Sequence, residues 1–427
     1  MHSQFINSSK AQFNFILSFI KKDFGKVLLY LFAVAMYFPM IFTNVISILL
    51  LVYCFFKFKR ADLIRVLKDK YVVVMLLFFF ILAFGFLYDI TSDGVLNNLE
   101  KKLSFIIFPV VIGLVGIEKK DIERIFALFF YTGILITTFA LIRSVLTPME
   151  ITGLKAFINH GLSDQINLHA TYLSMYLLFS LIYPLFFLQS VKSRIIKYFA
   201  YFLALLGVIY ILFLGARIIW LILFSLSCLR VIQIIRGSEK TKRNVHIIII
   251  ILLIIPTLVI AVRPLRERAK EMVNYNNEYN IKEVWGGRGI RLMIWESGME
   301  LLKREPLVGY GSSTAVQNEL NNTYKENKLG PLLYLMEKNG ESFNPHNQFL
   351  SEFLKHGLLL GLYYPFVLFF MAKDYNYNKS LIGFVFLLII FGVSLTETVL
   401  ELNKGIIYFS FFGSILHFNF KDKASLK

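Results

Sequence analysis

Long apolar segments follow one another along almost the whole chain, and no other feature of the sequence restricts the fold as strongly. A helix that crosses a bilayer needs about 20 mostly apolar residues, and by that measure we count about twelve such segments. They are residues 24–39, 41–56, 71–89, 103–117, 124–146, 167–190, 196–214, 217–236, 245–262, 347–372, 380–397 and 403–419. Hydrophobic residues make up 57% of the chain and charged residues 17%, which excludes an ordinary soluble enzyme. The sequence therefore predicts an all-α membrane protein with about twelve transmembrane helices.

Lysine and arginine gather in those loops between the apolar segments that would lie on one side of the membrane. Lysine and arginine are frequent in the loop at residues 57–70, in short connections between later segments and in the C-terminal tail. Since such loops stay in the cytoplasm, we expect both termini on the cytoplasmic side. The net charge of +17 arises mostly from this asymmetry, because residues 263–345 carry 12 Lys+Arg against 11 Asp+Glu. The charge therefore indicates topology and contact with membrane lipids, and it gives no sign of nucleic-acid binding.

One long polar stretch interrupts the apolar pattern. It divides the chain into residues 1–262, expected to hold spans 1 to 9, a large outer loop at 263–345, and residues 346–427, expected to hold spans 10 to 12 and a cytoplasmic tail. Within the loop, Arg291–Arg304 is expected to form an amphipathic helix that ends at Pro306. The residues expected on its apolar face share helical spacing: Leu292, Trp295, Met299 and Leu302. The loop is therefore predicted to contain short helices, and we expect it to carry part of the active site.

Glycines and two arginines lie next to the start of this expected helix. Gly286, Gly287 and Gly289 surround Arg288, and Arg291 follows. Exposed backbone N–H groups, the positive end of a helix and two guanidinium groups would together suit an anion such as phosphate. The same residues also fit an ordinary turn with two solvated arginines, and their spacing does not decide between the two interpretations.

Arg217 is the only charged residue between Lys197 and Arg230, in a run rich in Leu, Ile, Phe and Tyr. One interpretation is that it snorkels from a helix end to the membrane interface. The other is functional, because charges at the edge of a membrane are costly and often serve a substrate. Arginine suits a diphosphate, since its planar guanidinium binds two oxygens at once and stays charged.

Of the seven histidines, His346 has the most distinctive surroundings. It follows Pro345, ends the polar stretch and begins an apolar segment together with Asn347. An imidazole titrates near neutral pH and can accept a proton from an attacking hydroxyl. For His169, at the start of another segment, packing or hydrogen bonding is as reasonable as catalysis. The remaining histidines lie in no motif, and we expect them to be structural or assign them no role: His2, His160, His246, His356 and His417.

The sequence has no metal-binding or cofactor-binding motif. It has no GxxxxGK[ST] phosphate loop and no Asp-x-Asp pair. Cys54 and Cys228 lie in separate apolar segments without metal-like spacing. We therefore expect neither a metal nor a cofactor.

Several of these residues lie in motifs that resemble those of the O-antigen ligase and O-antigen polymerase superfamily. The motifs are Arg291–Trp295, Pro306–Gly311, His346–Leu350 with Gly357, and, earlier in the chain, His169–Tyr172 and Gly215–Arg217. Members of this superfamily are metal-independent glycosyltransferases of the bacterial inner membrane, which move a glycan from an undecaprenyl diphosphate carrier to an acceptor on the periplasmic face. The resemblance thus implies a large periplasmic loop between spans 9 and 10 and a periplasmic active site.

The resemblance also implies roles for individual residues. Arg217 and Arg291 would bind the donor diphosphate, with help from Arg288, and would neutralise charge on the leaving group. His346 would act as the general base on the acceptor hydroxyl, whose attack would invert the anomeric configuration. Further substrate contacts would come from Asn347, His169 and Tyr172.

The identity of the acceptor stays open in the sequence. The main expectation is ligation of the glycan to lipid A-core, and the alternatives are polymerisation onto a second carrier-linked glycan or transfer to a protein. A flippase or exporter is disfavoured, because it should place ionisable groups along the membrane midplane. Glu397 and Glu401, near an outer turn, are either acceptor contacts or solvated helix ends. Ala216 departs from the family, which often has serine there, so a hydroxyl contact to the diphosphate would be missing.

Overall fold

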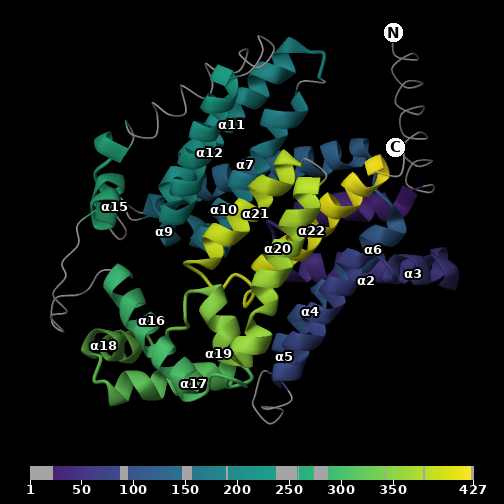
Figure 1. Ribbon diagram of the computed structural model, residues 1–427. Helices are drawn as coiled ribbons and strands as arrows, with labels where there is room; N and C mark the ends of the chain where they lie inside the picture. The colour runs from purple at the N-terminus through teal and green to yellow at the C-terminus, as the bar shows by residue number, and fades with distance from the viewer. Residues whose placement is uncertain are drawn as a thin grey trace, which may run out of the picture.

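The structure of the chain is a computed structural model, and it describes residues 23–86, 95–146, 156–188, 191–236, 257, 259–273, 287–340, 342–377 and 380–424. Every regular element within those residues is helical (Figure 1), which confirms the predicted all-α class. After a helix at residues 23–35, the helices are α2 (Met40–Lys57), α3 (Arg60–Leu67), α4 (Lys70–Phe86), α5 (Val95–Lys102), α6 (Ser104–Val115), α7 (Lys119–Leu146), α9 (His160–Ser163), η2 (Asp164–Ile166), α10 (Ala170–Ser180), η3 (Tyr183–Phe187), α11 (Arg194–Leu214), α12 (Arg217–Arg236), α15 (Arg263–Val273), α16 (Gly287–Arg304), α17 (Ser313–Glu326), α18 (Gly330–Asn339), α19 (Gln348–Gly361), α20 (Tyr363–Tyr377), α21 (Leu381–Ser394) and α22 (Asn403–Ala424).

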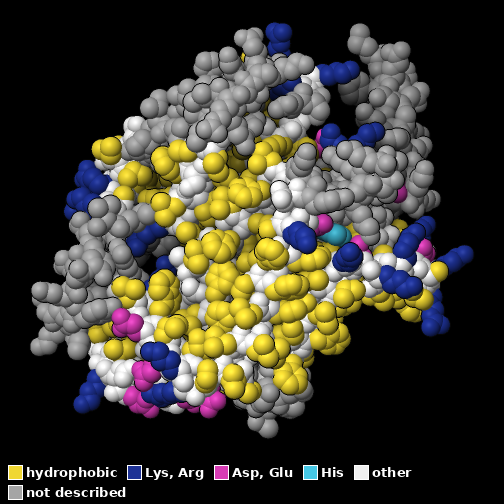
Figure 2. Space-filling view, in the orientation of Figure 1, with side chains coloured by type: hydrophobic (Ala, Val, Ile, Leu, Met, Phe, Trp, Pro, Cys, Tyr) yellow, Lys and Arg dark blue, Asp and Glu magenta, His cyan; other side chains and the backbone are white. Residues whose placement is uncertain are grey.

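Apolar length makes several of these helices suited to a membrane. Among the described residues, four are long and apolar enough to cross one: α2, α7, α10 continued into η3, and α11. Shorter apolar helices are α4, α12 and α21, and a broad band of hydrophobic side chains crosses the face shown in Figure 2. Most of the segment expected at 245–262 lies outside the described residues. The count of twelve spans therefore stays a prediction.

The segment expected as one span at 347–372 is bent in the structure. Gln348–Gly361 and Tyr363–Asn376 meet at an angle of 76°, and only the pair together is long and apolar enough to cross a membrane. Within α19, Gly357 has a φ of 68° and a ψ of 178°, so the helix is already interrupted there. The sequence did not predict this bend, because a hydrophobic run does not reveal a backbone break that depends on distant residues.

The interruption of α19 is matched by backbone pairing with the stretch that precedes α17. The N–H of Tyr310 donates to the carbonyl of Leu354 at 2.8 Å, and the N–H of Gly311 donates to the carbonyl of Lys355 at 2.8 Å. Carbonyls that lose their helical partner must find another donor when they are buried. The Pro306–Gly311 motif thus supplies the donors that let α19 break.

Gly357→Ala is expected to destabilise the protein strongly. An added Cβ would lie 2.0 Å from the carbonyl oxygen of Leu307, and the φ of 68° disfavours any side chain. Gly340→Ala is the matched control, because Gly340 has a φ of 63° and no atom within 4 Å of its added Cβ. We expect Gly357→Ala to lower the free energy of unfolding by about 1–3 kcal/mol more than Gly340→Ala does, as measured by thermal unfolding in detergent. Equal losses in the two variants would contradict this packing.

Aromatic side chains connect the C-terminal helix with helices from the first half of the chain. Tyr408 on α22 stacks on Tyr176 of α10 at a centroid distance of 5.5 Å. Phe412, one turn further along α22, contacts Phe179 of α10 at 4.8 Å and Phe129 of α7 at 4.9 Å. Rings of this size bury large apolar areas. Their packing fixes the start of α22, and with it the turn that precedes this helix.

Two histidines expected to be structural contact carboxylates. The Nδ1 atom of His417 lies 2.8 Å from Asp374, and its Nε2 atom lies 3.0 Å from Asp69. The Nε2 atom of His356 lies 3.4 Å from Glu352, one turn earlier on α19. Nothing around His417 in the sequence shows its partners, because they come from distant segments.

Helices α16, α17 and α18 share a second, smaller core with the start of α19. Its buried members are Met293, Ile294, Leu301, Leu302, Val316, Leu320, Tyr324, Leu332, Leu350 and Leu354. The first of these helices begins at Gly287, four residues before the expected start at Arg291. Its buried face is also rotated from the expected one, since Met299 is 49% exposed. The rotation arises because α16 packs against both α17 and α19.

Candidate functional site

A carboxylate joins two of the predicted site residues. Glu397 lies in the turn between α21 and α22, and its Oε1 atom is 2.9 Å from Nη2 of Arg291 on α16. Its Oε2 atom is 3.2 Å from Nδ1 of His346, which lies just before α19. Arg291 and His346 thus each contact one of the two carboxylate oxygens of Glu397.

The backbone at His346 is held in an uncommon conformation. His346 has a φ of 43°, in the left-handed region. Its N–H donates to Oδ1 of Asn344 at 2.9 Å, and Nε1 of Trp295 donates to the carbonyl of Pro345 at 3.0 Å. Both bonds are made by the peptide group that joins Pro345 to His346, so they hold the backbone from which the His346 ring extends.

Asn347 caps the N-terminus of α19. Its Oδ1 atom accepts from the N–H of Leu350 at 3.0 Å, and its Nδ2 group donates to the carbonyl of Leu395 at 3.3 Å. A cap of this kind is worth about 1 kcal/mol. Asn347 therefore links the start of α19 to the turn that carries Glu397. A substrate contact by the same side chain stays a prediction.

The Glu397 side chain is 14% exposed, and its surroundings favour the ionised form of the carboxyl group. Burial alone would raise its pKa, but the hydrogen bond with His346 and the nearby charge of Arg291 hold this pKa below its ordinary value. An ionised carboxylate only accepts hydrogen bonds, so Nδ1 of His346 carries the proton in the bond between them. In the neutral ring, Nε2 is then the atom that can accept a proton.

His169 and Tyr172 connect α10 with the same region. His169 precedes α10, and its Nδ1 atom accepts from the N–H of Thr171 at 3.3 Å. Its ring centroid lies 4.8 Å from that of His160. Burial lowers the pKa of His169, and the charge of Glu397 acts in the opposite direction, so the two groups are within electrostatic range. The hydroxyl of Tyr172 donates to the carbonyl of Thr398 at 3.5 Å. Thr398 is the residue that follows Glu397 in the sequence.

Arg217 begins α12, after Gly215 ends α11 in a left-handed conformation with a φ of 64°. Helix α12 packs on α21 so closely that a Cβ on Gly392 would lie 2.6 Å from Cδ1 of Ile222 and 3.6 Å from Cγ1 of Ile218. Since Gly392 lies near the C-terminal end of α21, Arg217 lies near the end of α21 that leads into the Glu397 turn. The structure therefore brings Arg217 to the same end of the bundle as Arg291 and His346.

The predicted glycine-rich anion site is described only in part. Gly286 and the side chain of Arg288 lie outside the described residues. Gly287 and Gly289 lie in the first turn of α16, so they belong to the helix and do not form a turn before it. A contact between Arg288 and a diphosphate stays a prediction.

The site residues are partly open to solvent. His346 is 28% exposed and Arg291 33% exposed. In the part of the chain that the structure describes, no group of three or more His, Cys, Asp or Glu side chains is arranged to hold a metal ion. The arrangement offers a proton acceptor beside a guanidinium, which suits removal of a proton from a hydroxyl next to an anionic leaving group.

Glu397 is the residue whose place the sequence did not predict. The available signal was that Glu397 and Glu401 are the acidic residues of a short turn between two apolar segments, at 380–397 and 403–419. Charged groups at the edge of a membrane are costly, so such a pair indicates a function. Its partners, His346 and Arg291, could not be predicted because they lie 51 and 106 positions away along the chain.

Comparison with known proteins points to the same family as the motifs do. Residues 202–365 match the sequence model of a family described as O-Antigen ligase. The chain is also 22% identical, over 204 residues, to the O-antigen ligase of Escherichia coli (strain K12). This alignment covers 47% of the chain and 47% of that protein, so the chain matches about half the length of its relative. The family match includes Arg217, Arg291 and His346 but ends before Glu397.

Proposed function

We propose that this chain is a member of the O-antigen ligase superfamily and that it transfers a glycan from an undecaprenyl diphosphate carrier to an acceptor hydroxyl. The observation that carries the proposal is the run of contacts from Arg291 through Glu397 to His346. It provides a base whose proton-accepting atom is defined and a cation beside it. The proposed reaction needs both of these.

In the proposed reaction, Nε2 of His346 takes the proton of the acceptor hydroxyl, while Nδ1–H stays bonded to Glu397. The hydroxyl oxygen forms a bond to the anomeric carbon as the bond from that carbon to the diphosphate oxygen breaks. The electron pair of the broken bond stays on the diphosphate. Because attack and departure occur on opposite faces of the sugar, the anomeric configuration inverts. His346 afterwards returns its proton to solvent.

Two arginines would neutralise the leaving diphosphate. Arg291 uses Nη2 for Glu397, and because a guanidinium has five N–H donors, others remain for phosphate oxygens. Arg217, near the same end of the bundle, would supply a second guanidinium. An electrostatic contact that strengthens in the transition state is worth roughly 3 kcal/mol. Further contacts with the substrates would come from Asn347, His169 and Tyr172.

We place the site on the periplasmic face of the bacterial inner membrane, with both termini in the cytoplasm. The positively charged loop at 57–70 supports this orientation, since such loops stay inside. Helices α16–α18 lie together beside the other helices (Figure 1), and because α16 carries Arg291 they would be on the same side of the membrane as the site. Residues 263–345 would then form a periplasmic loop between spans 9 and 10.

Lipid A-core is the acceptor that we propose, on the strength of the match to an O-antigen ligase. The same base and arginines would serve polymerisation, in which the acceptor is a second carrier-linked glycan. They would also serve transfer to a protein hydroxyl. A flippase is disfavoured, because the candidate residues gather near one end of the bundle and do not line a path across it.

The acceptor is tested with purified protein in lipid vesicles that receive an undecaprenyl diphosphate-linked glycan. One reaction contains lipid A-core and a second omits it, and the products are resolved on a gel. Addition of glycan to lipid A-core, seen in the first reaction alone, is the expected result. Longer carrier-linked chains in the second reaction would identify a polymerase. No product in either would contradict transfer to these acceptors.

A further inference from the structure

We propose that four charged residues, three of them buried and one mostly buried, position Glu397 against His346. The four are Lys102, Glu352, Lys355 and Glu401, and we refer to them as the buried charge cluster. The inference rests on the proposed function, because it gives these residues a part in aligning the base. None of them touches Glu397 or His346 in a described contact, so they are positioning residues and not catalytic ones.

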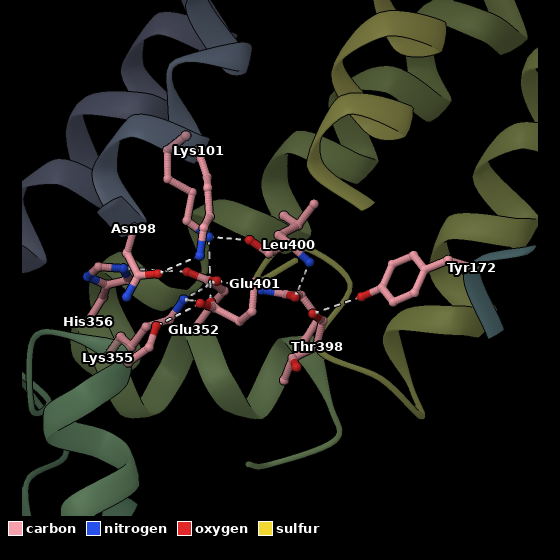
Figure 3. Close-up of polar contacts among 12 residues, drawn as sticks. Asn98, Lys101, Tyr172, Glu352, Lys355, His356, Thr398, Leu400 and Glu401 are labelled. Carbon is pink, nitrogen blue, oxygen red and sulfur yellow. Dashed lines mark hydrogen bonds and ion pairs between the residues drawn. The ribbon is translucent and has the colours of Figure 1, made fainter. Parts of the chain in front are cut away.

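The cluster joins three separate parts of the chain, and Figure 3 shows its members Glu352, Lys355 and Glu401. On α19, Nζ of Lys355 lies 2.7 Å from Oε1 of Glu352 and 2.6 Å from Oε1 of Glu401 in the turn before α22. From α5, Nζ of Lys102 lies 3.6 Å from the same Oε1 atom of Glu401. The side chains of Lys102, Glu352 and Lys355 are at most 5% exposed, and that of Glu401 is 17% exposed.

Burial of these charges is not explained by stability alone. Two lysines and two glutamates balance in charge, but removing each from water is costly, and a buried ion pair is often no more stable than packed apolar residues. Such groups are better explained where they fix one specific arrangement of the chain. The arrangement fixed here is that of residues 395–402.

This segment, residues 395–402, connects α21 to α22 without regular helix, and side chains from other elements bind its backbone. The N–H of Leu400 donates to Oε1 of Gln348 at 2.7 Å, and the carbonyl of Leu400 accepts from Nζ of Lys102. Towards its start, the segment is bonded by Tyr172 and Asn347, as described above. At its end, Oγ of Ser313 donates to Oε2 of Glu401 at 2.7 Å. The segment that carries Glu397 is therefore held from both ends.

Gln348 connects the cluster to His346 as well. It lies two residues after His346, and its Nε2 group donates to Oε1 of Glu352 at 2.6 Å, while its Oε1 atom accepts from Leu400. The cluster thus sets the place of both partners, His346 through Gln348 and Glu397 through Glu401 and Leu400. A displacement of about 1 Å at such a pair can cost about 100-fold in rate.

The test is Glu401→Gln, which removes the charge at the centre of the cluster and keeps the shape of the side chain. We expect kcat for glycan transfer in vesicles to fall about 10- to 100-fold with KM for the donor unchanged. Glu326→Gln is the matched control, because Glu326 makes the same kind of ion pair with Arg304 but is 56% exposed. Its kcat is expected to equal that of the wild type.

A double-mutant cycle separates positioning from an unrelated structural effect. If Glu401 acts through Glu397, then Glu401→Gln will cause no further loss of kcat in a Glu397→Gln background. Losses that multiply, or a wild-type kcat for Glu401→Gln, would overturn the proposal. If Glu401→Gln does not fold, Lys355→Met combined with Glu401→Gln removes one charge of each sign and takes its place.

Hydrogen exchange gives a readout that does not depend on activity. In Glu401→Gln we expect backbone amides of residues 395–402 to exchange at least about 10-fold faster, while the middle of α22 keeps its wild-type protection. Unchanged exchange at 395–402 would overturn the positioning role. A wild-type protein that transfers no glycan would instead contradict the proposed function, and the exchange rates would still decide the role of the cluster.

Discussion

Replacement of His346 is expected to lower kcat for glycan transfer by about 10²- to 10⁴-fold, the usual contribution of a general base. The acceptor hydroxyl is a weak nucleophile until its proton is removed, and Nε2 of His346 is the atom assigned to remove it. His346→Asn is the preferred variant, since asparagine tolerates the φ of 43° at this position better than alanine does. Initial rates in lipid vesicles, at saturating donor, give the comparison.

Two controls accompany this variant. Lys68→Ala changes an exposed lysine beyond the end of α3, outside the site, and should keep the wild-type rate. His346→Ala should match His346→Asn in kcat, although it carries additional strain at the positive φ. Near-normal turnover of a folded His346 variant at neutral pH would exclude this residue as the base.

Glu397→Gln should be nearly as damaging, with a loss of about 10²- to 10⁴-fold in kcat. The amide can donate to Nδ1 of His346, which shifts the ring proton to Nε2 and leaves no atom there to accept a proton. It also removes the charge that pairs with Arg291 at 2.9 Å. Expression and thermal stability report whether the variant stays folded.

Glu397→Asp distinguishes the effect of the carboxylate charge from the effect of side-chain length. It keeps a carboxylate but shortens the side chain, so part of the activity should return relative to Glu397→Gln. A Glu397→Gln protein with wild-type kcat would show that the bond between Glu397 and His346 has no part in the reaction.

The helices could be predicted because their signal is local. Hydrophobic runs at 41–56, 124–146 and 196–214 appear as α2, α7 and α11 with nearly the same limits. The bend in α19 could not be predicted in this way. It depends on Gly357 and on donors from Tyr310 and Gly311, which become neighbours only after folding.

The site shows the same division between local and distant information. His346 and Arg291 stand in recognisable motifs, so their importance was expected. The contacts of both residues with Glu397 were not expected, because they join α16, the stretch before α19 and the turn before α22. The buried face of α16 differs from the expected one for the same reason, since Met299 has helical spacing but is 49% exposed.

The central claim is tested most directly by one assay of purified protein in lipid vesicles. Wild type and His346→Asn are each given an undecaprenyl diphosphate-linked glycan and lipid A-core, with a chelator present throughout, and the glycosylated lipid is measured over time. The account predicts steady product from the wild type despite the chelator and a rate lower by about 10²- to 10⁴-fold from the variant. Equal rates from the two proteins, or turnover that the chelator abolishes, would contradict it.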